Sequence, residues 1–347
     1  MQVYAFEPSS RKALDYFSDA VSMIERFKQN GRRETILEGK AMLERACEED
    51  PGWVTPAYYC GILADLAGRP QEAIDQYNRI EHFFQPPFLY ELLYNQGVAL
   101  FHRYHKVFRD QAKEKLKKVW RDTDGPIKLL AGSFLAQVLG MDVLGKVRSE
   151  ESRETARAAY SKCEKMADAT LARLENWLKG QTDGSGSIRY VANEIKWGAL
   201  NAKGFARNFY SDYLPAKDRE GLVQEAVKYF NVCLQLKPNH WASLCNLASA
   251  YMRMGATFSA DNKTEEAHES LEKALATIDR VLADDIRPNY CFALYERGRI
   301  LRIIGDRDEA LKSFNRAISQ PEGEKDVSDP SINSEIDRTK NGDRSFP

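Results

Sequence analysis

One short pattern recurs along this 347-residue sequence. The stretch GRPQEAIDQYNRI lies in its first third and GDRDEALKSFNRAI in its last third. When Ala73 is aligned with Ala310, Gly61 falls on Gly298 and Tyr77 falls on Phe314. Small residues let two helices approach closely, and an aromatic side chain fills the space beside them. The pattern therefore predicts a helix, a tight glycine turn and a second helix.

Three further stretches fit the same frame: QEAVKYFNVCLQLKP, GKAMLERACEEDP and HWASLCNLASAYMRMG. In the last of them Ala248, Tyr251 and Gly255 occupy positions of the pattern, with Gly255 at the turn glycine. An insertion then separates them from the continuation TEEAHESLEKAL. Apolar residues recur three and four positions apart, as one buried face of a helix requires. A single hairpin cannot cover its own apolar face, so we expect the hairpins to stack on one another.

This pattern resembles the tetratricopeptide repeat family, whose unit of about 34 residues carries an aromatic residue, Leu-Gly, Tyr, Ala, an aromatic residue, Ala and Pro in that order. The resemblance is strong at residues 54–82, 241–282 and 288–319, and weaker at 12–50 and 88–121. It implies an all-α fold, a right-handed α-solenoid of about seven antiparallel helical hairpins.

We expect five segments along the chain: an N-terminal extension (1–11), N-terminal hairpins (12–125), a divergent middle section with long helices (126–187), C-terminal hairpins (188–320) and a tail (321–347). The middle section begins with an apolar run, which is too short to span a bilayer and predicts a buried helix. One long amphipathic helix that ends at Gly180 follows it. The tail is rich in Pro, Gly, Ser and acidic residues and has no apolar periodicity, so we expect it to be disordered.

The composition argues against several classes of binding partner and against secretion. Fifty basic and fifty-one acidic residues leave a net charge of -1, so no global field favours nucleic acid or an anionic membrane. The six cysteines form no CxxC and no cluster with histidine, as expected of a reduced, cytoplasmic protein. The first residues do not read as a secretory signal. We expect no membrane partner.

No enzyme motif is present, so we expect no catalytic residue, no cofactor and no metal site. The sequence has no HExxH, no GxSxG and no GxxxxGK[ST]. The loop DGSGS lacks a lysine and a preceding strand, which favours a connector over a phosphate loop. His102 and His105 could bind a metal only with a third ligand, and we interpret them as helix-surface residues. Cys47, Cys60 and Cys233 fall where the repeat needs a small buried side chain.

One basic helix, at residues 103–121, leaves an alternative function open. It predicts possible contacts to RNA or single-stranded nucleic acid from Lys106, Arg109, Lys113, Lys117 and Arg121. In the competing interpretation, the buried stripe of a second repeat helix consists of Phe108, Leu116 and Trp120. The lysines then lie on the solvent-facing side of that helix.

In the tetratricopeptide family the first helix of each hairpin lines a concave face, where partners bind as extended or helical segments. The resemblance places the partner-binding side chains of this chain at Tyr58, Tyr94, Asn95, His102, Asn246, Arg253, Tyr295, Arg299 and Arg302. Asn95 and Asn246 would hold equivalent positions and bind a ligand's backbone. Burial of Arg299 and Arg302 would require charge partners inside the protein, so we expect both to be free for a ligand.

These observations favour a non-catalytic scaffold or sensor that binds a segment of a partner protein. Two alternatives stay open: nucleic-acid binding through residues 103–121, and service as the recognition part of a larger enzyme or signalling complex. The family's chaperone-binding members use Lys and Asn to clamp a terminal carboxylate. Here Tyr58, Tyr94, Cys245 and Tyr295 hold the corresponding places, which argues against that role.

Overall fold

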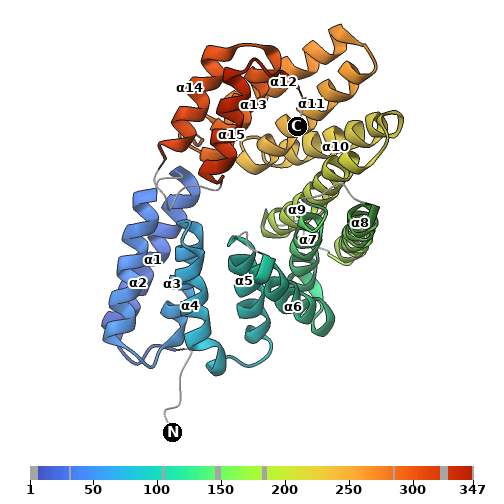
Figure 1. Ribbon diagram of the computed structural model, residues 1–347. Helices are drawn as coiled ribbons and strands as arrows, with labels where there is room; N and C mark the ends of the chain where they lie inside the picture. Colours follow the sequence, from blue (N-terminus) through green and yellow to red (C-terminus); the bar gives the residue numbers. More distant parts are fainter. Residues whose placement is uncertain are drawn as a thin grey trace. The chain divides into compact units, whose positions relative to one another are not determined.

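The computed structural model describes residues 7–30, 33–103, 106–144, 150–181, 186–283, 286–320 and 327–345. The chain divides into two compact units, Met1–Val138 and Leu139–Pro347, with the boundary inside helix α7. Within the described ranges the regular structure is helical throughout, with no strand. The all-α repeat fold expected from the sequence is therefore confirmed (Figure 1).

The N-terminal unit consists of successive helical hairpins. Its helices are α1 (Arg11–Asn30), α2 (Arg33–Glu49), α3 (Val54–Leu66), α4 (Pro70–Ile80), α5 (Phe88–Phe101), α6 (Lys106–Asp122) and most of α7 (Gly125–Met141), with a short 3-10 turn η1 (Glu81–Phe83) after α4. The hairpins α1–α2, α3–α4 and α5–α6 pack internally, and α2 and α4 each pack on the next hairpin. The apolar run of the middle section forms α7, and its Leu129, Leu135 and Val138 are buried as predicted.

The C-terminal unit continues the same arrangement. Its helices are α8 (Glu150–Lys179), α9 (Gly186–Tyr210), α10 (Ala216–Leu236), α11 (Trp241–Ala260), α12 (Thr264–Val281), α13 (Cys291–Ile304), α14 (Arg307–Ile318) and α15 (Asp329–Lys340), with a 3-10 turn η2 (Ser211–Tyr213) after α9. The predicted long helix ending before Gly180 is confirmed as α8. Much of the DGSGS loop lies outside the described residues.

Glycines on the first helices set the close approach within the hairpins. They form what we call the slot, in which a glycine faces a large side chain of the second helix: Gly61 and Tyr77, Gly97 and Leu116, Gly204 and Phe230, Gly255 and Leu271, Gly298 and Phe314. A methyl group on Gly298 would lie 2.5 Å from the Phe314 ring, and one on Gly204 would lie 2.7 Å from Phe230. The pairing of small and aromatic residues read from the sequence is therefore the packing unit of the hairpin.

The slot corrects the sequence alignment of hairpin α11–α12. Gly255 was aligned with a turn, followed by an insertion, but it lies inside α11 and faces Leu271. Ala267 and Leu271 follow Gly255 at the same spacing as Ala310 and Phe314 follow Gly298. The hairpin therefore needs no insertion, and α11 is instead longer at its N-terminal end.

This register also overturns the predicted equivalence of two asparagines. Asn95 lies two residues before its slot glycine Gly97, whereas Asn246 lies nine residues before Gly255. The two side chains therefore stand at different levels of their hairpins. Any ligand contact that one of them makes has no counterpart at the other.

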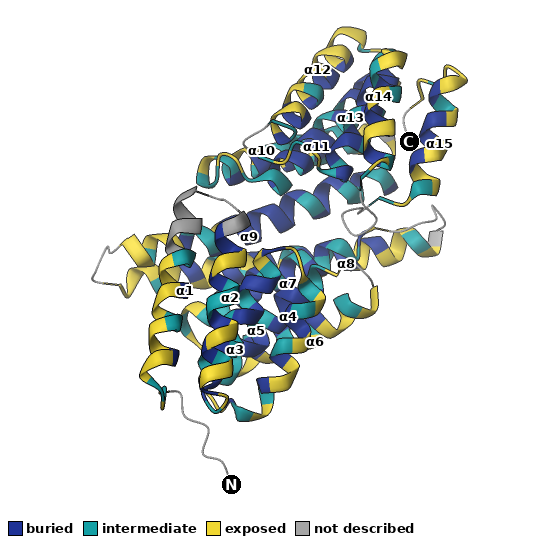
Figure 2. Cartoon of the chain, turned by 90° about the vertical axis from the view of Figure 1, so that its left-hand side faces the viewer, coloured by how far each residue is buried: buried dark blue, intermediate teal, exposed yellow. Residues whose placement is uncertain are grey.

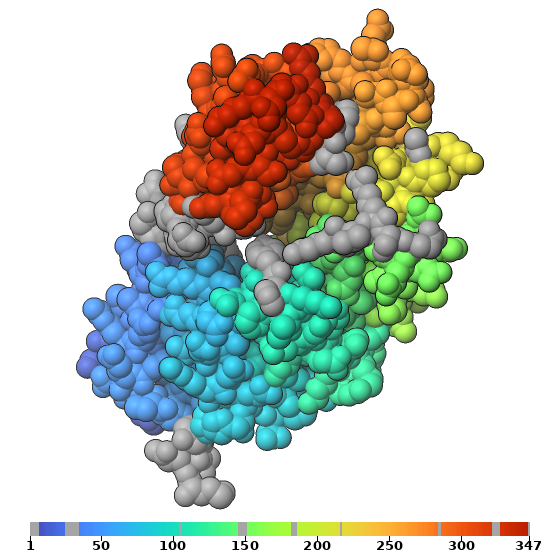
Figure 3. All heavy atoms as spheres, viewed as in Figure 1, coloured from blue at the N-terminus to red at the C-terminus, as the bar shows by residue number. Residues whose placement is uncertain are grey.

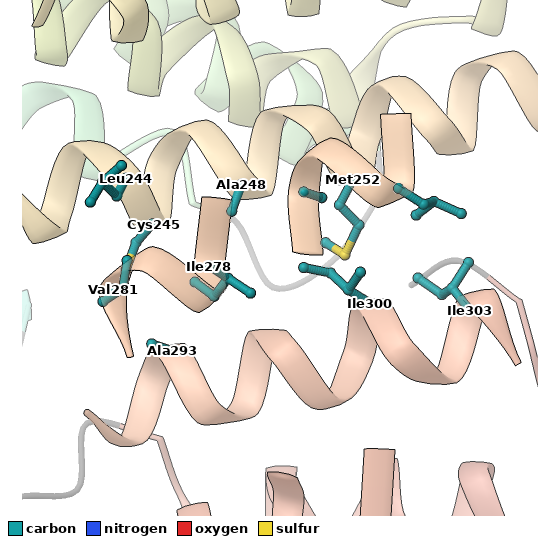
Figure 4. Packing of buried hydrophobic residues seen from close by; sticks show 11 residues of the cluster. Leu244, Cys245, Ala248, Met252, Ile278, Val281, Ala293, Ile300 and Ile303 are labelled. Atoms are coloured by element: carbon teal, nitrogen blue, oxygen red, sulfur yellow. The ribbon is translucent and has the colours of Figure 1, made fainter. Parts of the chain in front are cut away.

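Buried side chains between hairpins form the core of the C-terminal unit. Figure 4 shows Met252 of α11 beside Ile300 and Ile303 of α13, with Ile278 of α12 close by. Met252 is 2 % exposed and Ile300 is fully buried. Each helix thus presents its dark blue face to its neighbours and its yellow face to solvent (Figure 2).

The prediction that residues 321–347 are disordered is wrong for the described part, 327–345. Residues Asp329–Lys340 form α15, which packs on α14 and also touches α13. Ile332 is fully buried and Ile336 is 8 % exposed, both in the cluster around Phe314. Four buried side chains on one face of the helix, Ile332, Glu335, Ile336 and Thr339, were too few and too mixed to reveal it in the sequence. Figure 3 shows α15, in dark red, at the surface of the C-terminal unit.

Candidate protein-interaction surface

In the N-terminal unit, side chains of the first helices α3 and α5 pair with one another. Asn95 Nδ2 donates to Tyr58 Oη at 2.6 Å. Seven residues further along both helices, about two turns, His102 Nδ1 lies 2.9 Å from Asp65 Oδ1. All four side chains are partly exposed. The predicted residues Tyr58, Asn95 and His102 are therefore brought together on one face, and their neighbours hold them in fixed positions.

Aromatic rings surround these pairs. Tyr58 lies 5.7 Å from the ring of Phe84, and Tyr94 lies 5.7 Å from Phe134 of α7 in an edge-on arrangement. Burial, followed by the charge of Glu91, raises the pKa of Tyr58 well above its usual range. Tyr58 therefore keeps its phenolic proton, which it can donate while its oxygen accepts from Asn95.

In the C-terminal unit, α9 and α11 are joined in the same way. Asn246 Nδ2 donates to Asn201 Oδ1 at 3.2 Å. Arg253 binds Asp212 through two parallel hydrogen bonds of 3.0 and 2.9 Å, and its guanidinium lies 4.3 Å from the centre of the Phe209 ring. A bidentate pair stacked on an aromatic ring is strongly oriented. Arg253 therefore fixes the register of α11 on η2.

Helix α13 carries the last predicted set, and two of its members interact. Arg299 Nη1 donates to Glu296 Oε1 at 2.6 Å, and its guanidinium lies 5.4 Å from the Tyr295 ring. The Arg299 side chain is 14 % exposed, and its Nε has no hydrogen-bond partner. Burial, opposed by the charge of Arg299, raises the pKa of Tyr295. Tyr295 and Arg299 thus lie together, but Arg299 is largely covered.

The expectation that Arg302 is free for a ligand is wrong. Its side chain is 1 % exposed and its Nε donates to Glu335 Oε2 of α15 at 2.9 Å. Its Nη1 donates to the backbone oxygens of Asp343 and Ser345 at 2.7 and 2.9 Å. The sequence argument was sound in requiring internal partners for a buried arginine. It failed because the segment that supplies them was taken as disordered.

The comparisons with known proteins bear on the fold that carries these side chains. Residues 293–322 match the family model described as tetratricopeptide repeat. A tetratricopeptide repeat protein from Parabacteroides merdae has a similar structure, with a TM-score of 0.53 and 12% sequence identity, over 95% of this chain and 100% of that chain. The chain therefore contains a tetratricopeptide repeat at residues 293–322, within a fold similar to that of a tetratricopeptide repeat protein.

Two other solved structures are less similar. The assembly chaperone of RpL4, Acl4 (residues 1–338), matches with 14% identity and a TM-score of 0.49, over 83% of this chain and 95% of that chain. The human IFIT1 dimer with PPP-AAAA matches with 15% identity and a TM-score of 0.40, over 92% of this chain and 75% of that chain. No curated protein matches the sequence.

The basic helix α6 has much of its charge paired locally. Lys113 lies 2.9 Å from Asp110, Lys117 lies 3.0 Å from Glu114, and Arg121 lies 2.6 Å from Asp122. These are surface pairs, which oppose phosphate binding only weakly. Lys106 is exposed and Arg109 is partly buried.

The buried stripe of α6 differs from the one expected. Ala112, Leu116 and Val119 are buried, whereas Phe108 and Trp120 are partly exposed. Leu116 fills the slot beside Gly97, as the second helix of a tetratricopeptide repeat should. The competing interpretation is therefore right that α6 packs as the second helix of its hairpin, but wrong about the stripe, of which Leu116 alone is buried.

No metal site and no membrane span were found in the parts that the structure describes. These residues include no group of three histidine, cysteine or acidic side chains placed to hold a metal ion. His102 pairs with Asp65, while His105 lies outside the described residues. Among the described helices, none combines the length and the apolar character that crossing a bilayer requires.

His240, which the sequence analysis did not single out, caps α11 and predicts a pH effect. Its Nδ1 accepts from the backbone N–H of Ser243 at 3.3 Å, and its ring lies 4.3 Å from that of Trp197. Burial, together with the charge of Lys237, lowers the pKa of His240 to about 4. The unfolded chain therefore binds a proton at a pH where the folded protein does not.

We expect stability from this group to be complete above about pH 6.5 and to be lost as the pH falls towards 4. The loss should be on the order of 2–3 kcal/mol. His240→Asn keeps a cap acceptor without the titration. Urea unfolding at several pH values should give a shallower decline for this variant than for the parent. Parallel curves would contradict the assignment.

Proposed function

We propose that this protein is a non-catalytic scaffold or sensor that binds an extended or helical segment of a partner protein along its first helices. The observation that carries the proposal is a set of paired side chains. They are partly exposed on α3 and α5, and in the other unit the partly exposed Asn246 and Arg253 of α11 are held by the buried Asn201 of α9 and by Asp212 of η2. Because their partners already fix these groups, a ligand would bind without the entropic cost of ordering them.

The paired side chains keep capacity for further hydrogen bonds. Asn95 uses one amide hydrogen for Tyr58, which leaves its second hydrogen and its carbonyl oxygen. Asn246 is in the same state towards Asn201. An amide with one donor and one acceptor to spare matches the backbone of an extended chain, whatever its sequence. Tyr58 and Tyr94 add the aromatic area that is common at interface hot spots.

The predicted site is smaller than the sequence suggested. Arg302 belongs to the contact with α15, and Arg253 is fully engaged by Asp212 and Ser249. We therefore centre the proposed surface on Tyr58, Tyr94 and Asn95 in one unit and on Asn246 and Tyr295 in the other. Arg299 supports Tyr295 rather than reaching a ligand itself.

The test compares pull-downs from native lysate, with and without nuclease, for the intact chain and for two variants. Tyr94→Ala with Asn95→Ala alters one unit, and Asn246→Ala with Tyr295→Ala alters the other. We expect either variant to lose nuclease-resistant protein partners by about tenfold or more. Asp75→Ala with Lys273→Ala, on exposed positions of second helices, should retain them. Retention by all the variants would sink the proposal.

Nucleic-acid binding is the outcome that would replace it. Nuclease-sensitive partners that survive both surface variants and disappear with Lys117→Glu and Arg121→Glu would move the function to α6.

We also propose a cytoplasmic location. The six cysteines, five of them buried and none in a disulfide, support a reducing compartment.

A further inference from the structure

An open cleft of about 810 Å³ lies within the C-terminal unit, between α8 and the C-terminal end of α9. One wall is a face of α8 that extends from Arg153 to Asp168. The other wall runs from Tyr210, at the end of α9, through η2 to Pro215. The volume lies within the usual range of ligand sites, about 300–1,000 Å³.

Stacked tyrosines form the base of this cleft, which we call the α8 cleft. The rings of Tyr160 and Tyr210 lie 4.7 Å apart with an interplanar angle of 8°, and Tyr210 and Tyr213 lie 6.4 Å apart. The guanidinium of Arg207 lies 5.9 Å from the centre of the Tyr160 ring. The tyrosines are therefore held rigidly, and their edges offer both apolar area and hydroxyl groups.

Two acidic side chains that line the cleft, the partly buried Glu164 and the exposed Asp168, are already paired with cations. Glu164 pairs with Arg207, and Asp168 Oδ1 lies 2.5 Å from Lys203 Nζ. Both cations come from α9 and are about 10 % exposed. These pairs therefore belong to the packing of α8 on α9, and they leave little negative charge to repel an anion.

The remaining charge in the cleft is mostly positive. Arg157 and Lys165 are exposed, and neither makes an ion pair with the residues that the structure describes. Ser161 lies between them on the same helical face, one turn from each. Two cations with a hydroxyl between them outnumber Glu154, the lining carboxylate that makes no ion pair with the described residues. The exposed Asp168 is held by Lys203, so the balance of unpaired charge favours an anionic ligand.

We propose that the α8 cleft binds an extended acidic segment of a partner protein, with acidic side chains four residues apart that meet Arg157 and Lys165. Eight residues of helix separate the two cations, a rise of about 12 Å. Side chains at i and i+4 of an extended peptide point the same way and lie about 13 Å apart. The wall from Arg153 to Asp168 is about 22 Å long, enough for six or seven extended residues.

The shape of the site decides between this ligand and other anions. A small anion would fill only one end of so long a cleft. A nucleic-acid strand would bring a phosphate to every nucleotide. Among the residues described as lining the cleft, the unpaired positive charge comes from Arg157 and Lys165, with Glu154 beside them. This inference goes beyond the proposed function, since none of the residues on which that surface is centred lines the cleft.

The test uses a fluorescein-labelled peptide, Ser-Glu-Ser-Gly-Ser-Glu-Ser, and the full chain, with binding measured by fluorescence anisotropy at low salt. The matched peptides carry Gln in place of Glu, or the two Glu residues side by side. We expect the spaced peptide to bind about tenfold or more tightly than either control. Arg157→Glu with Lys165→Glu should weaken it by a similar factor.

Lys162→Glu is the matched control, because Lys162 is exposed on α8 but does not line the cleft. It should change the affinity less than about twofold, apart from the general effect of charge. Equal losses for Lys162→Glu and for the cleft variant would overturn the proposal. So would equal binding of the three peptides, or tighter binding of single-stranded RNA that is lost in the cleft variant. Variants of Tyr94 and Asn246 should leave the peptide affinity unchanged, which separates this test from that of the proposed function.

Discussion

Replacing Phe314 by alanine should lower the free energy of unfolding of the last hairpin by about 3–5 kcal/mol. Phe314 is fully buried, and its ring fills the slot against Gly298 and contacts the cluster that includes Ile332 of α15. With no side chain on Gly298, little can move in to refill the cavity. Hydrogen exchange of the α13 and α14 amides should measure the effect, because repeat arrays open locally as well as globally.

Two further variants make the Phe314 result specific. Gly298→Ala should cost about 1–3 kcal/mol, because its methyl group would lie 2.5 Å from the Phe314 ring. Combined with Phe314→Leu, the same change should cost less than the sum of the two single changes, since leucine gives the methyl group more room. Strict additivity would show that the two residues do not share one slot. Lys312→Ala, on the exposed face of α14, should have no measurable effect.

Replacing Arg302 by alanine should destabilise α15 and the last hairpin by about 2–4 kcal/mol. The change leaves Glu335 buried with Arg338 as its cation among the described residues, at 2.9 Å. It also removes the Arg302 hydrogen bonds to the carbonyls of Asp343 and Ser345, and Ser345 keeps its hydrogen bond from Arg338 Nη2 at 3.1 Å. Limited proteolysis should then cut the chain near residue 345 at much lower protease concentrations.

A double variant separates the buried pair from simple packing. Arg302→Met with Glu335→Leu removes both charges and keeps apolar volume, so it should recover part of the loss. If the double variant is as unstable as Arg302→Ala with Glu335→Ala, the ion pair itself contributes nothing specific. Arg316→Ala, on the exposed face of α14, should leave the protease resistance of residues 327–345 unchanged.

The hairpins could be predicted because their signal is local and repeated. Gly61 with Tyr77 and Gly298 with Phe314 occur at one spacing, and that spacing is the geometry of the slot. The hairpin α11–α12 was misaligned because α11 is longer than α3 and α13, the first helices that set the pattern, and residues such as Ala248 then occupy the place of a slot glycine. Small residues are common on both faces of a long buried helix, so spacing alone could not choose between them.

The surface was harder to predict than the fold, because its state depends on distant partners. The sequence placed Tyr58, Asn95 and His102 on first helices. It could not reveal that each of these side chains pairs with a residue of the neighbouring first helix. Arg302 was misjudged for the same reason: its partners come from 33 to 43 residues further along the chain. Pairing of this kind follows from how the helices stack, and no local pattern encodes it.

The contact of Arg302 with α15 and residues 343–345 also bears on the order in which the array comes apart. In a stack whose members touch only their neighbours, melting starts at an end and advances inwards. The last hairpin cannot begin to open until α15 has lifted and the buried guanidinium has left Glu335. The contact should therefore slow unfolding from the C-terminal side. In a pulling experiment on that side, the first force peak should report the rupture of the Arg302 contact.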